Sequence, residues 1–587
     1  MRKLLIYLKD YKKESILGPL FKLLEASFEL FVPLVMAAII DVGIANGDKN
    51  YILKMCGVLI LLAVIGLVCS ITAQFFAAKA AVGFAAKLRH VLFAHIQSLS
   101  YTEMDAIGTS TMITRMTSDI NQVQSGVNMV LRLFLRSPFI VFGAMVMAFT
   151  IDVKAALIFV VIIPLLAIVV FGIMLITIPL FKKVQSGLDE VLGITRENLT
   201  GSRVIRAFHK EKEEIETFHE KNQLLTNLQL YVGKISALMN PLTYILINAA
   251  LLVLIWVGAI RVDNGAILQG EVVALVNYMS QILIELVKLA NLIITVTKAV
   301  ACGNRIESVF EIHSSMSDGH RTKSDAHAGG NPAKRQDYAV CFDNVSMGYQ
   351  GGGEYAVSNI NLKVKRGETV GVIGGTGSGK STVINLIPRF YDVSEGAVYV
   401  SGEDVRDYKL SELRDKIGIV PQKAVLFAGT IRENMKWGKA DATDEEINEA
   451  LDIAQAREFV EQKEGKLDAE IEQGGRNLSG GQKQRLTIAR ALVKKPEILI
   501  LDDSASALDY ATDAALRHSI REMKNAPTVF IVSQRAASIL HADQILVLDD
   551  GDVAGLGTHA ELLENCEVYQ EIYYSQFSKE EGEEVHS

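Results

Sequence analysis

Long apolar stretches fill the first half of the chain, whereas shorter apolar runs alternate with polar segments in the second half. A helix needs about 20 apolar residues to cross a bilayer. Six stretches of at least that length lie near 16–44, 55–84, 127–150, 155–180, 236–260 and 272–298. We therefore predict a membrane α-helical domain over 1–312 and a soluble α/β domain over 338–587.

Two further segments flank the six spans. Residues 313–337 are polar, rich in Gly and Ser and without periodicity, which is typical of a linker. The first residues, MRKLLIYLKDYKKE, are basic and amphipathic and lack a small-residue cleavage site. This pattern favours a helix on the inner membrane face over a signal peptide.

The distribution of cations predicts the orientation of the spans. An even number of spans places both chain ends on one side of the membrane. The loops after spans one, three and five carry only Lys49, Lys154 and Arg261, with Lys54 at a span edge. The other side is far richer in Lys and Arg, which places it in the cytosol together with both termini and the soluble domain.

The loops on the two sides differ greatly in length. The external loops have about 4–12 residues, whereas the segments between spans two and three and between spans four and five have roughly 40–55. A structureless loop of that length is uncommon in a compact protein. We expect spans two to five to continue as helices into the cytosol.

Composition supports a chain that is part membrane and part soluble. Of the 587 residues, 50% are hydrophobic without counting Gly and 21% are charged, which is more apolar than an ordinary soluble domain. The net charge of −8 argues against nucleic acid as a partner. The five cysteines are scattered without a metal or disulfide spacing, so we expect reduced thiols.

A glycine-rich loop in GETVGVIGGTGSGKST (367–382) predicts a phosphate site. Gly374, Gly379, Lys380 and Ser381 fit the pattern G-x-x-x-x-G-K-[ST] between an apolar strand and a helix start. Glycines let backbone N–H groups surround phosphate oxygens, and the helix N-terminus adds partial positive charge. Lys380 is expected to reach the β- and γ-phosphates, and Ser381 to ligate Mg²⁺. The predicted ATP-binding residues of this loop are Gly374, Gly375, Thr376, Gly377, Ser378, Gly379, Lys380, Ser381 and Thr382.

Two more motifs follow in the same domain. KPEILILDD (495–503) is a buried-type strand that ends in two carboxylates, and Asp502 is placed to bind Mg²⁺ through water. In LSGGQKQRLTIARAL (478–492), Ser479, Gly480 and Gly481 precede a helix and form a second anion-ready helix start.

Together and in this order, the motifs resemble those of an ATP-binding-cassette exporter half-transporter of the multidrug or lipid type, and the resemblance covers essentially the whole chain. The implied fold is that of a type I exporter with one cytosolic P-loop ATPase domain. The resemblance assigns further roles. They are the signature (Ser479, Gly480, Gly481 and Gln482), the Q-loop and a Mg²⁺ contact (Gln422), the D-loop (Ser506–Asp509), an adenine-stacking aromatic (Tyr349) and the coupling-helix regions (95–105 and 197–208).

The resemblance also implies a mechanism. Two such ATPase domains meet head to tail, and each ATP lies between the phosphate loop of one and the signature of the other. ATP closes the pair, hydrolysis reopens it, and the coupling helices carry this motion to the spans, which alternate between inward- and outward-facing states.

Two residues depart from the family pattern at the γ-phosphate. Asp503 stands where the family usually has Glu, which retracts the carboxylate by one methylene, and Gln534 stands where it has the switch histidine. Gln can donate a hydrogen bond but cannot become cationic. With Gln422 and Lys380, these residues form the implied catalytic set.

The resemblance implies that the intact signature acts on a partner's nucleotide. We therefore expect a chain that resembles the degenerate-site subunit of a heterodimeric bacterial multidrug exporter, set in a bacterial inner membrane. Its partner half-transporter should carry Glu and His at the positions of Asp503 and Gln534. The alternatives are a homodimeric lipid or peptide exporter and a non-catalytic, ATP-binding regulatory subunit.

Ionisable residues inside the spans indicate either a cargo cavity or polar contacts between helices. Glu25 and Glu29 share a face of span one, and Arg132 and Arg136 share a face of span three at a matching depth. We expect these residues to pair, for example Glu25 with Arg132, or to line one cavity for a hydrophobic or amphipathic cargo such as a drug or lipid. Span six adds four candidates for the cavity, namely Asn277, Gln281, Glu285 and Lys288.

Overall fold

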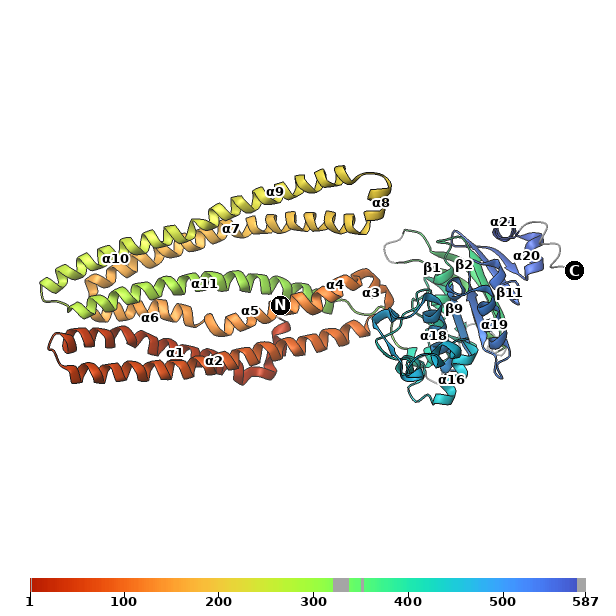
Figure 1. Cartoon of the computed structure of the whole chain (residues 1–587), viewed down its shortest axis with the longest axis horizontal. Coiled ribbons are helices and arrows are strands. Elements are labelled where there is room, and N and C mark those ends of the chain that lie inside the picture. The colour runs from red at the N-terminus through yellow and green to blue at the C-terminus, as the bar shows by residue number, and fades with distance from the viewer. Residues whose placement is uncertain (2, 320–336, 350–352, 578–587) are drawn as a thin grey trace. The chain divides into compact units, whose positions relative to one another are not determined.

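The computed structural model describes the chain except for residues 2, 320–336, 350–352 and 578–587 (Figure 1). Two compact units share the polypeptide. The first comprises Met1–Gln97 and Thr109–Ile312, and the second comprises Ser98–Gly108 and His313–Ser587. The chain therefore enters the second unit twice.

The first unit is entirely helical in its described part. Its α-helices are α1 (Lys12–Ala38), α2 (Lys49–Ser98), α4 (Thr109–Thr114), α5 (Ile120–Leu133), α6 (Arg136–Ile151), α7 (Val153–Thr200), α8 (Ser202–Ala207), α9 (Glu211–Ala237), α10 (Met239–Asp263) and α11 (Gln269–Phe310). A 3-10 helix covers Leu4–Tyr11, and π-helical turns cover Ile39–Ile44 and Arg115–Asp119.

Six helical segments are long and apolar enough to cross a membrane, which confirms the six predicted spans. They run over Leu4–Ile44, Lys49–Ser98, Thr109–Ile151, Val153–Thr200, Glu211–Asp263 and Gln269–Phe310. α2 has 50 residues and α7 has 48, more than twice the length that a bilayer needs. The predicted helical continuation of these spans is therefore confirmed. α8 joins α7 to α9, and α7 and α9 lie side by side (Figure 1).

The third span is broken between α5 and α6. Phe134 and Leu135 separate the two helices, and Pro138 follows in the first turn of α6. Proline has no N–H to donate to the carbonyl four residues earlier, and its ring clashes with that carbonyl. The break places Arg136 and Ser137 at the start of a new helix within an apolar segment.

The second unit is built on sheets. The antiparallel sheet has the order β2 (Val357–Lys365), β1 (Tyr338–Met347), β4 (Glu395–Val400) and β5 (Glu403–Asp404). The larger sheet has the order β12 (Asp552–Gly557), β11 (Gln544–Asp549), β3 (Thr369–Gly374), β10 (Thr528–Val532), β9 (Ile498–Asp502) and β6 (Ile417–Val420). β7 (Gly429–Thr430) and β8 (Glu470–Ile471) pair separately.

Within the larger sheet β11, β3, β10, β9 and β6 are parallel, and β12 is antiparallel. Alternate residues of β9 belong to two different buried clusters, with Leu499 and Leu501 in one and Ile498 and Ile500 in the other. Both faces of the sheet are therefore covered, which explains the uninterrupted apolar run of this strand.

Helices cover the sheet and form the remaining part of the unit. They are α3 (Tyr101–Ile107), α13 (Lys380–Leu386), α14 (Leu410–Asp415), α15 (Ile431–Lys436), α16 (Asp444–Ile453), α17 (Arg457–Glu461), α18 (Gly480–Val493), α19 (Tyr510–Arg521), α20 (His559–Asn565) and α21 (Glu567–Tyr574). Short 3-10 turns cover Lys466–Asp468, Gln473–Gly475, Ser504–Ala507 and Ala536–Ser538.

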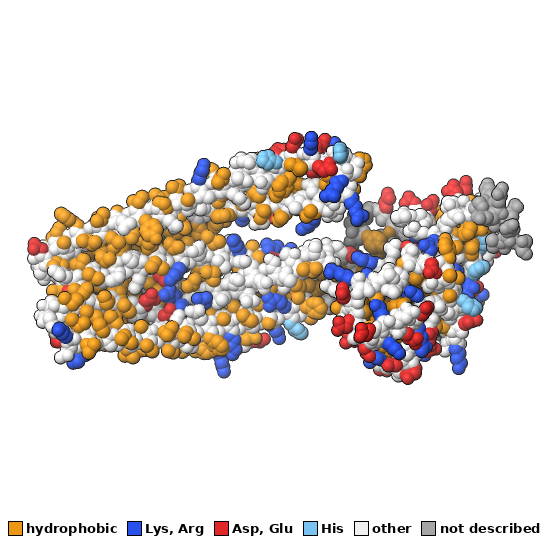
Figure 2. Space-filling model, in the orientation of Figure 1, with side chains coloured by type: hydrophobic (Ala, Val, Ile, Leu, Met, Phe, Trp, Pro, Cys, Tyr) orange, Lys and Arg blue, Asp and Glu red, His pale blue; other side chains and the backbone are white. Residues whose placement is uncertain are grey.

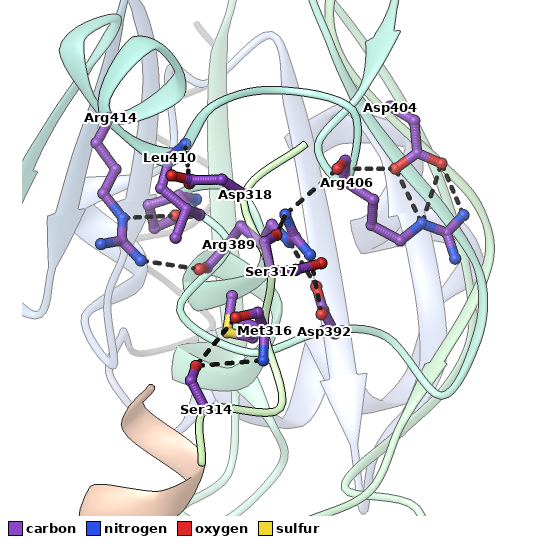
Figure 3. A network of polar contacts seen from close by, with 11 residues as sticks. Ser314, Met316, Ser317, Asp318, Arg389, Asp392, Asp404, Arg406, Leu410 and Arg414 are labelled. Atoms are coloured by element: carbon purple, nitrogen blue, oxygen red, sulfur yellow. Dashed lines mark hydrogen bonds and ion pairs between the residues drawn. The ribbon is translucent and has the colours of Figure 1, made fainter. Parts of the chain in front are cut away.

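The beginning of the predicted linker is bound to the second unit (Figure 3). Arg389, only 4% exposed, donates through Nη1 to the carbonyl oxygen of Ser317 at 3.1 Å. The Asp318 carboxylate accepts from the backbone N–H of Leu410 at 3.1 Å. Residues 313–319 are therefore part of the folded unit, which the polar composition of this segment did not indicate. Residues 320–336 of the predicted linker lie outside the described residues.

Candidate ATP site and intramembrane charge cluster

The phosphate-binding loop lies between β3 and α13, at the carboxyl end of a parallel strand. Gly377 and Gly379 adopt φ angles of +87° and +88°, which glycine tolerates better than other residues. A Cβ on Gly374 would lie 2.1 Å from the carbonyl oxygen of Leu548, whereas a Cβ on Gly375 or Gly377 would meet nothing within 4 Å. The loop is therefore tight against the sheet on one side and open on the other, as a phosphate cradle requires.

Lys380 starts α13 and directs its ammonium group into the loop. Its Nζ donates to the carbonyl oxygen of Gly374 at 3.0 Å and to Ser378 Oγ at 3.3 Å. Burial lowers the pKa of Lys380, and the neighbouring carboxylates of Asp503 and Asp502 oppose that shift. A cation that is already surrounded by oxygen acceptors is well placed to bind phosphate oxygens.

Ser381 and Asp502 provide adjacent oxygen donors. Ser381 Oγ donates to the two carboxylate oxygens of Asp502 at 3.1 and 3.3 Å. Asp502 ends β9 and is buried. Burial raises the pKa of its carboxyl, the Ser381 hydroxyl opposes this effect, and the Asp503 charge adds to it. Mg²⁺ prefers oxygen ligands of this kind, so these residues would hold it, and the bound ion would neutralise charge on the phosphates.

Asp503 lies in a strained backbone conformation next to Gln422. Its φ is +45°, a region that residues other than glycine rarely occupy and that is often found at functional sites. Its backbone N–H donates to the carbonyl oxygen of Val532 at 2.9 Å. Gln422 Nε2 donates to Asp503 Oδ2 at 3.4 Å. The structure therefore brings the predicted Q-loop residue to the predicted catalytic carboxylate.

Gln534 follows β10 and has an exposed side chain. The next residue, Arg535, joins this segment to the D-loop. Its guanidinium donates to the carbonyl oxygens of Ala505 and Leu508 at 3.3 Å and of Ser506 at 3.4 Å. The loop after β10 is thereby fixed against the segment that follows Asp503. Sequence reasoning did not single out Arg535.

The signature residues form the N-terminus of α18. Ser479 Oγ accepts from the backbone N–H of Gln482 at 3.3 Å, and Gln482 Oε1 accepts from the backbone N–H of Ser479 at 3.0 Å. This reciprocal capping leaves the N–H groups of Gly480 and Gly481 at the helix start for an anion. Within the described part of the chain, the Ser479 and Gln482 side chains bond to each other's backbone N–H and not to the phosphate loop.

Aromatic side chains connect the predicted adenine side with α3, which overlaps the first predicted coupling-helix region. The hydroxyl of Tyr349 is 3.0 Å from Thr382 Oγ1, and its ring packs edge-on against Tyr391 with centroids 5.3 Å apart. Tyr391 in turn donates to Asp105 Oδ2 at 2.6 Å. Burial and the Asp105 carboxylate raise the pKa of Tyr391, so it remains a hydrogen-bond donor at neutral pH.

A charge cluster lies at the break of the third span, and Figure 2 shows red and blue side chains gathered within an otherwise orange region of the helices. Arg136 is 6% exposed and donates through Nη1 to Glu285 Oε1 at 2.6 Å and through Nη2 to Glu29 Oε2 at 2.7 Å. Glu285 also accepts from Ser137 Oγ at 2.7 Å and from Lys288 Nζ at 2.8 Å. Two carboxylates and two cations from three helices therefore balance one another.

The predicted pairing of Glu25 with Arg132 is wrong. Glu25 instead accepts from Lys22 Nζ at 2.5 Å, because these residues are one helical turn apart on α1. Within the described residues no carboxylate pairs with Arg132, whose Nε is buried without a partner. The predicted pairing of the two helices is made by Arg136 and Glu29.

The remaining span-six residues have different surroundings. Asn277 is exposed and donates to the carbonyl oxygen of Val273 at 3.0 Å. Gln281 Oε1 is buried without a partner among the described residues. The structure therefore brings Glu285 and Lys288 into the cluster and leaves Asn277 outside it. Ser137 and Lys22 were missed, although Pro138 within an apolar stretch could have drawn attention to the break.

A nucleotide-binding unit joined in one chain to six membrane-length helices is the architecture of an ATP-driven transporter. The family model for the ABC transporter transmembrane region matches residues 15–286, and the model described as ABC transporter matches residues 357–506. The chain belongs to the ABC transporter family, as a half-transporter whose ATPase is coupled to export.

Relatives match along nearly the whole chain. The ABC transporter ATP-binding protein YfiB of Bacillus subtilis is 36% identical over 99% of this chain and 100% of its own. YgaD of the same organism, named as a multidrug export ATP-binding/permease protein, is 33% identical over 98% of both chains. An ATP-dependent lipid A-core flippase of Desulfotalea psychrophila is 34% identical over 83% of both chains.

A solved structure shares the fold. The ATP-bound structure of a bacterial Atm1-family ABC exporter superimposes with a TM-score of 0.77 and 22% sequence identity, covering 97% of this chain and 99% of the other. This similarity confirms the predicted exporter fold.

Proposed function

We propose that this chain is one subunit of a heterodimeric exporter that moves hydrophobic or amphipathic compounds, drugs or lipids, out of the cytosol by alternating access. Its own ATP site binds nucleotide firmly and hydrolyses it weakly. Its signature completes a competent site on a different half-transporter. The observation that carries the proposal is the combination of Asp503 and Gln534 at one sheet edge with an intact signature.

The geometry around Asp503 supports weak hydrolysis. Its carboxylate is one methylene shorter than the Glu usual in the family, a retraction of about 1.5 Å. A misplacement of about 1 Å can reduce a rate by a factor of 10². Asp503 is in hydrogen-bond contact with Gln422, so a water that it polarises would have to approach closer to β9 than a Glu would require.

The binding parts of the site support retained affinity for ATP. Lys380, Ser381 and Asp502 lie together at the open face of the phosphate loop. The roles of Tyr349 at adenine and of Gln534 at the γ-phosphate are part of the proposal. A pocket that retains phosphate and metal donors but has altered groups for water activation is suited to holding ATP.

A heterodimer requires a second chain of the same type. Three of the relatives, YfiB, YgaD and YfiC, come from one strain of Bacillus subtilis, and each matches 98–99% of this chain. One genome can therefore encode several half-transporters. This supports a heterodimer, in which the partner would carry Glu and His at the corresponding positions.

The cargo class follows from the membrane unit and the relatives. Names of relatives include multidrug export and lipid A-core flipping, both of which concern amphipathic or apolar molecules. We propose that the charge cluster around Arg136, together with Glu25, Arg132, Asn277 and Gln281, borders the cavity that admits such molecules. The bacterial relatives support a bacterial inner-membrane location, and the Lys and Arg distribution supports the placement of both termini in the cytosol.

The decisive experiment measures ATPase activity of the detergent-solubilised chain alone and after co-purification with a candidate partner half-transporter. We expect little turnover alone and substrate-stimulated turnover in the complex. Lys380→Ala serves as the control for nucleotide binding. Brisk turnover by the lone chain in a self-associated form would support the homodimeric alternative and reject the heterodimer.

A non-catalytic regulatory subunit is the second candidate, because the same two residues favour it. It predicts that a complex containing this chain hydrolyses ATP equally well when the signature is mutated. Loss of turnover in Gly480→Asp would exclude it.

A further inference from the structure

The loop that carries Gln534 is held by a residue from the far end of the chain. Gln576 Nε2 donates to the carbonyl oxygen of Gln534 at 2.8 Å, and Gln576 Oε1 accepts from the backbone N–H of Ala536 at 2.9 Å. One side-chain amide therefore bridges the backbone groups of two residues of the loop, Gln534 and Ala536. Both halves of the amide are used, which fixes its orientation.

The rest of the unit holds Gln576 in place. Its backbone N–H and that of Phe577 both donate to the carbonyl oxygen of Tyr573, each at 3.0 Å. Tyr573 is buried, and its ring stacks on Phe577 with centroids 4.8 Å apart. Because the chain after α21 is fixed by these contacts, the Gln576 amide can impose a position on the loop.

The Gln534 side chain needs such support. It is exposed and has one more rotatable bond than a histidine, so its terminal amide samples more positions for a given backbone. On the other side, Arg535 ties the same loop to the D-loop carbonyls. Gln576 and Arg535 together therefore leave the Gln534 backbone little freedom.

We propose that Gln576 is a positioning residue for the ATP site, which sets the loop after β10 so that Gln534 reaches the γ-phosphate. The inference rests on the proposed role of Gln534 in holding ATP. Gln534 would contact only the γ-phosphate, so Gln576 contributes to the discrimination between ATP and ADP. General binding of nucleotide does not depend on it.

The test measures the ratio of the Kd values for ADP and for a non-hydrolysable ATP analogue, with Mg²⁺ present, in the full-length solubilised chain. Gln576→Met retains the length and bulk of the side chain but removes the amide. We expect this variant to lower the ratio about threefold to tenfold, since one or two hydrogen bonds position the loop. The Kd for ADP should change by less than about twofold.

Two companion variants define the mechanism. Gln576→Glu can still accept from Ala536 but places an acceptor oxygen against the Gln534 carbonyl, so its ratio should fall at least as far as that of Gln576→Met. Gln570→Met is the matched control, because Gln570 lies on α21 and donates to the carbonyl oxygen of Leu563 at 2.7 Å, away from the loop. Its ratio should remain that of wild type.

A double-mutant comparison of Gln534 and Gln576 shows whether Gln576 acts by positioning Gln534 or has a general structural role. Gln534→Ala should lower the ratio, and the addition of Gln576→Met should lower it no further. Additive losses, a parallel loss of ADP binding, or an equal effect of Gln570→Met would overturn the positioning role. An unchanged ratio in Gln534→Ala would instead remove the γ-phosphate role of Gln534 from the proposed function, and the positioning role with it.

Discussion

At the scale of single residues, the ATP site contains two adjacent aspartates whose roles are set by their surroundings. Asp502 and Asp503 are neighbours in sequence with different surroundings, because Asp502 ends the buried strand β9 and Asp503 turns into a left-handed backbone conformation. The first is bonded to Ser381 and the second to Gln422. Under the proposed function, the same functional group would therefore serve metal binding in one position and water activation in the next.

Asp503 and Gln534, the two departures from the family pattern, should together limit the rate of ATP hydrolysis. We expect Asp503→Glu alone to restore little turnover, because Gln534 still cannot carry a proton or positive charge. Asp503→Glu combined with Gln534→His should raise the single-turnover rate of this site by about 10²-fold. Single-turnover hydrolysis by the complex in which the partner's own site is inactivated measures this, and full recovery in Asp503→Glu alone would contradict it.

Removal of the Arg136 side chain should strongly reduce the stability of the membrane unit. It is buried and bonded to both Glu29 and Glu285, and removal of one partner from a buried ion pair typically costs about 3–5 kcal/mol. Thermal unfolding in detergent should therefore show a large loss of stability for Arg136→Ala. Lys210→Ala, which removes an exposed pair with Glu213, is the control and should cost about 0–1 kcal/mol.

At the scale of elements, α3 is bound to the nucleotide unit by aromatic and polar contacts. Tyr101 packs against Phe390 with ring centroids 4.5 Å apart, and Tyr391 donates to Asp105. Ser100 and Glu103 also cap the helix reciprocally. A short helix of seven residues is marginal by itself, so these contacts determine its position.

We expect Tyr391→Phe to weaken coupling while leaving nucleotide binding intact. The variant keeps the ring contacts and removes the charge-assisted hydrogen bond to Asp105, a bond of a class worth about 1.5–3 kcal/mol. Stimulation of ATPase by cargo should fall several-fold, whereas the Kd for ATP should change by less than about twofold. A comparable loss of ATP affinity would show that the bond serves the ATP site directly.

The elements were largely predictable from the sequence because periodicity and length are local properties. The six spans and the strand before the phosphate loop follow from apolar runs alone. Contacts between elements that lie far apart in the sequence were harder to predict. The sequence placed Arg132 and Arg136 on one face, but only packing shows that Arg136 meets Glu29 and Glu285 while Glu25 turns to its own helix neighbour. Gln576 lies 42 residues from Gln534 and carries no motif.

At the scale of the whole molecule, the proposed heterodimer makes an asymmetric prediction. In a complex with the partner, Gly480→Asp in this chain should abolish most ATPase activity, because a carboxylate would oppose phosphate at the helix start. Lys380→Ala in the same chain should reduce activity only a few-fold, since its own site contributes little hydrolysis. Steady-state ATPase of the complex measures both, and equal losses would contradict the asymmetry.

The double entry of the chain into the second unit limits how transporters of this kind can be recombined. Residues Ser98–Gly108 and the segment that begins at His313 fold with the cassette, although each is continuous with a membrane helix. A graft of another protein's ATPase at residue 338 would leave Tyr101, Asp105 and Ser317 facing a foreign surface. A functional chimera should therefore exchange 98–108 and 313–319 together with the cassette, so the natural unit of exchange is discontinuous in the gene.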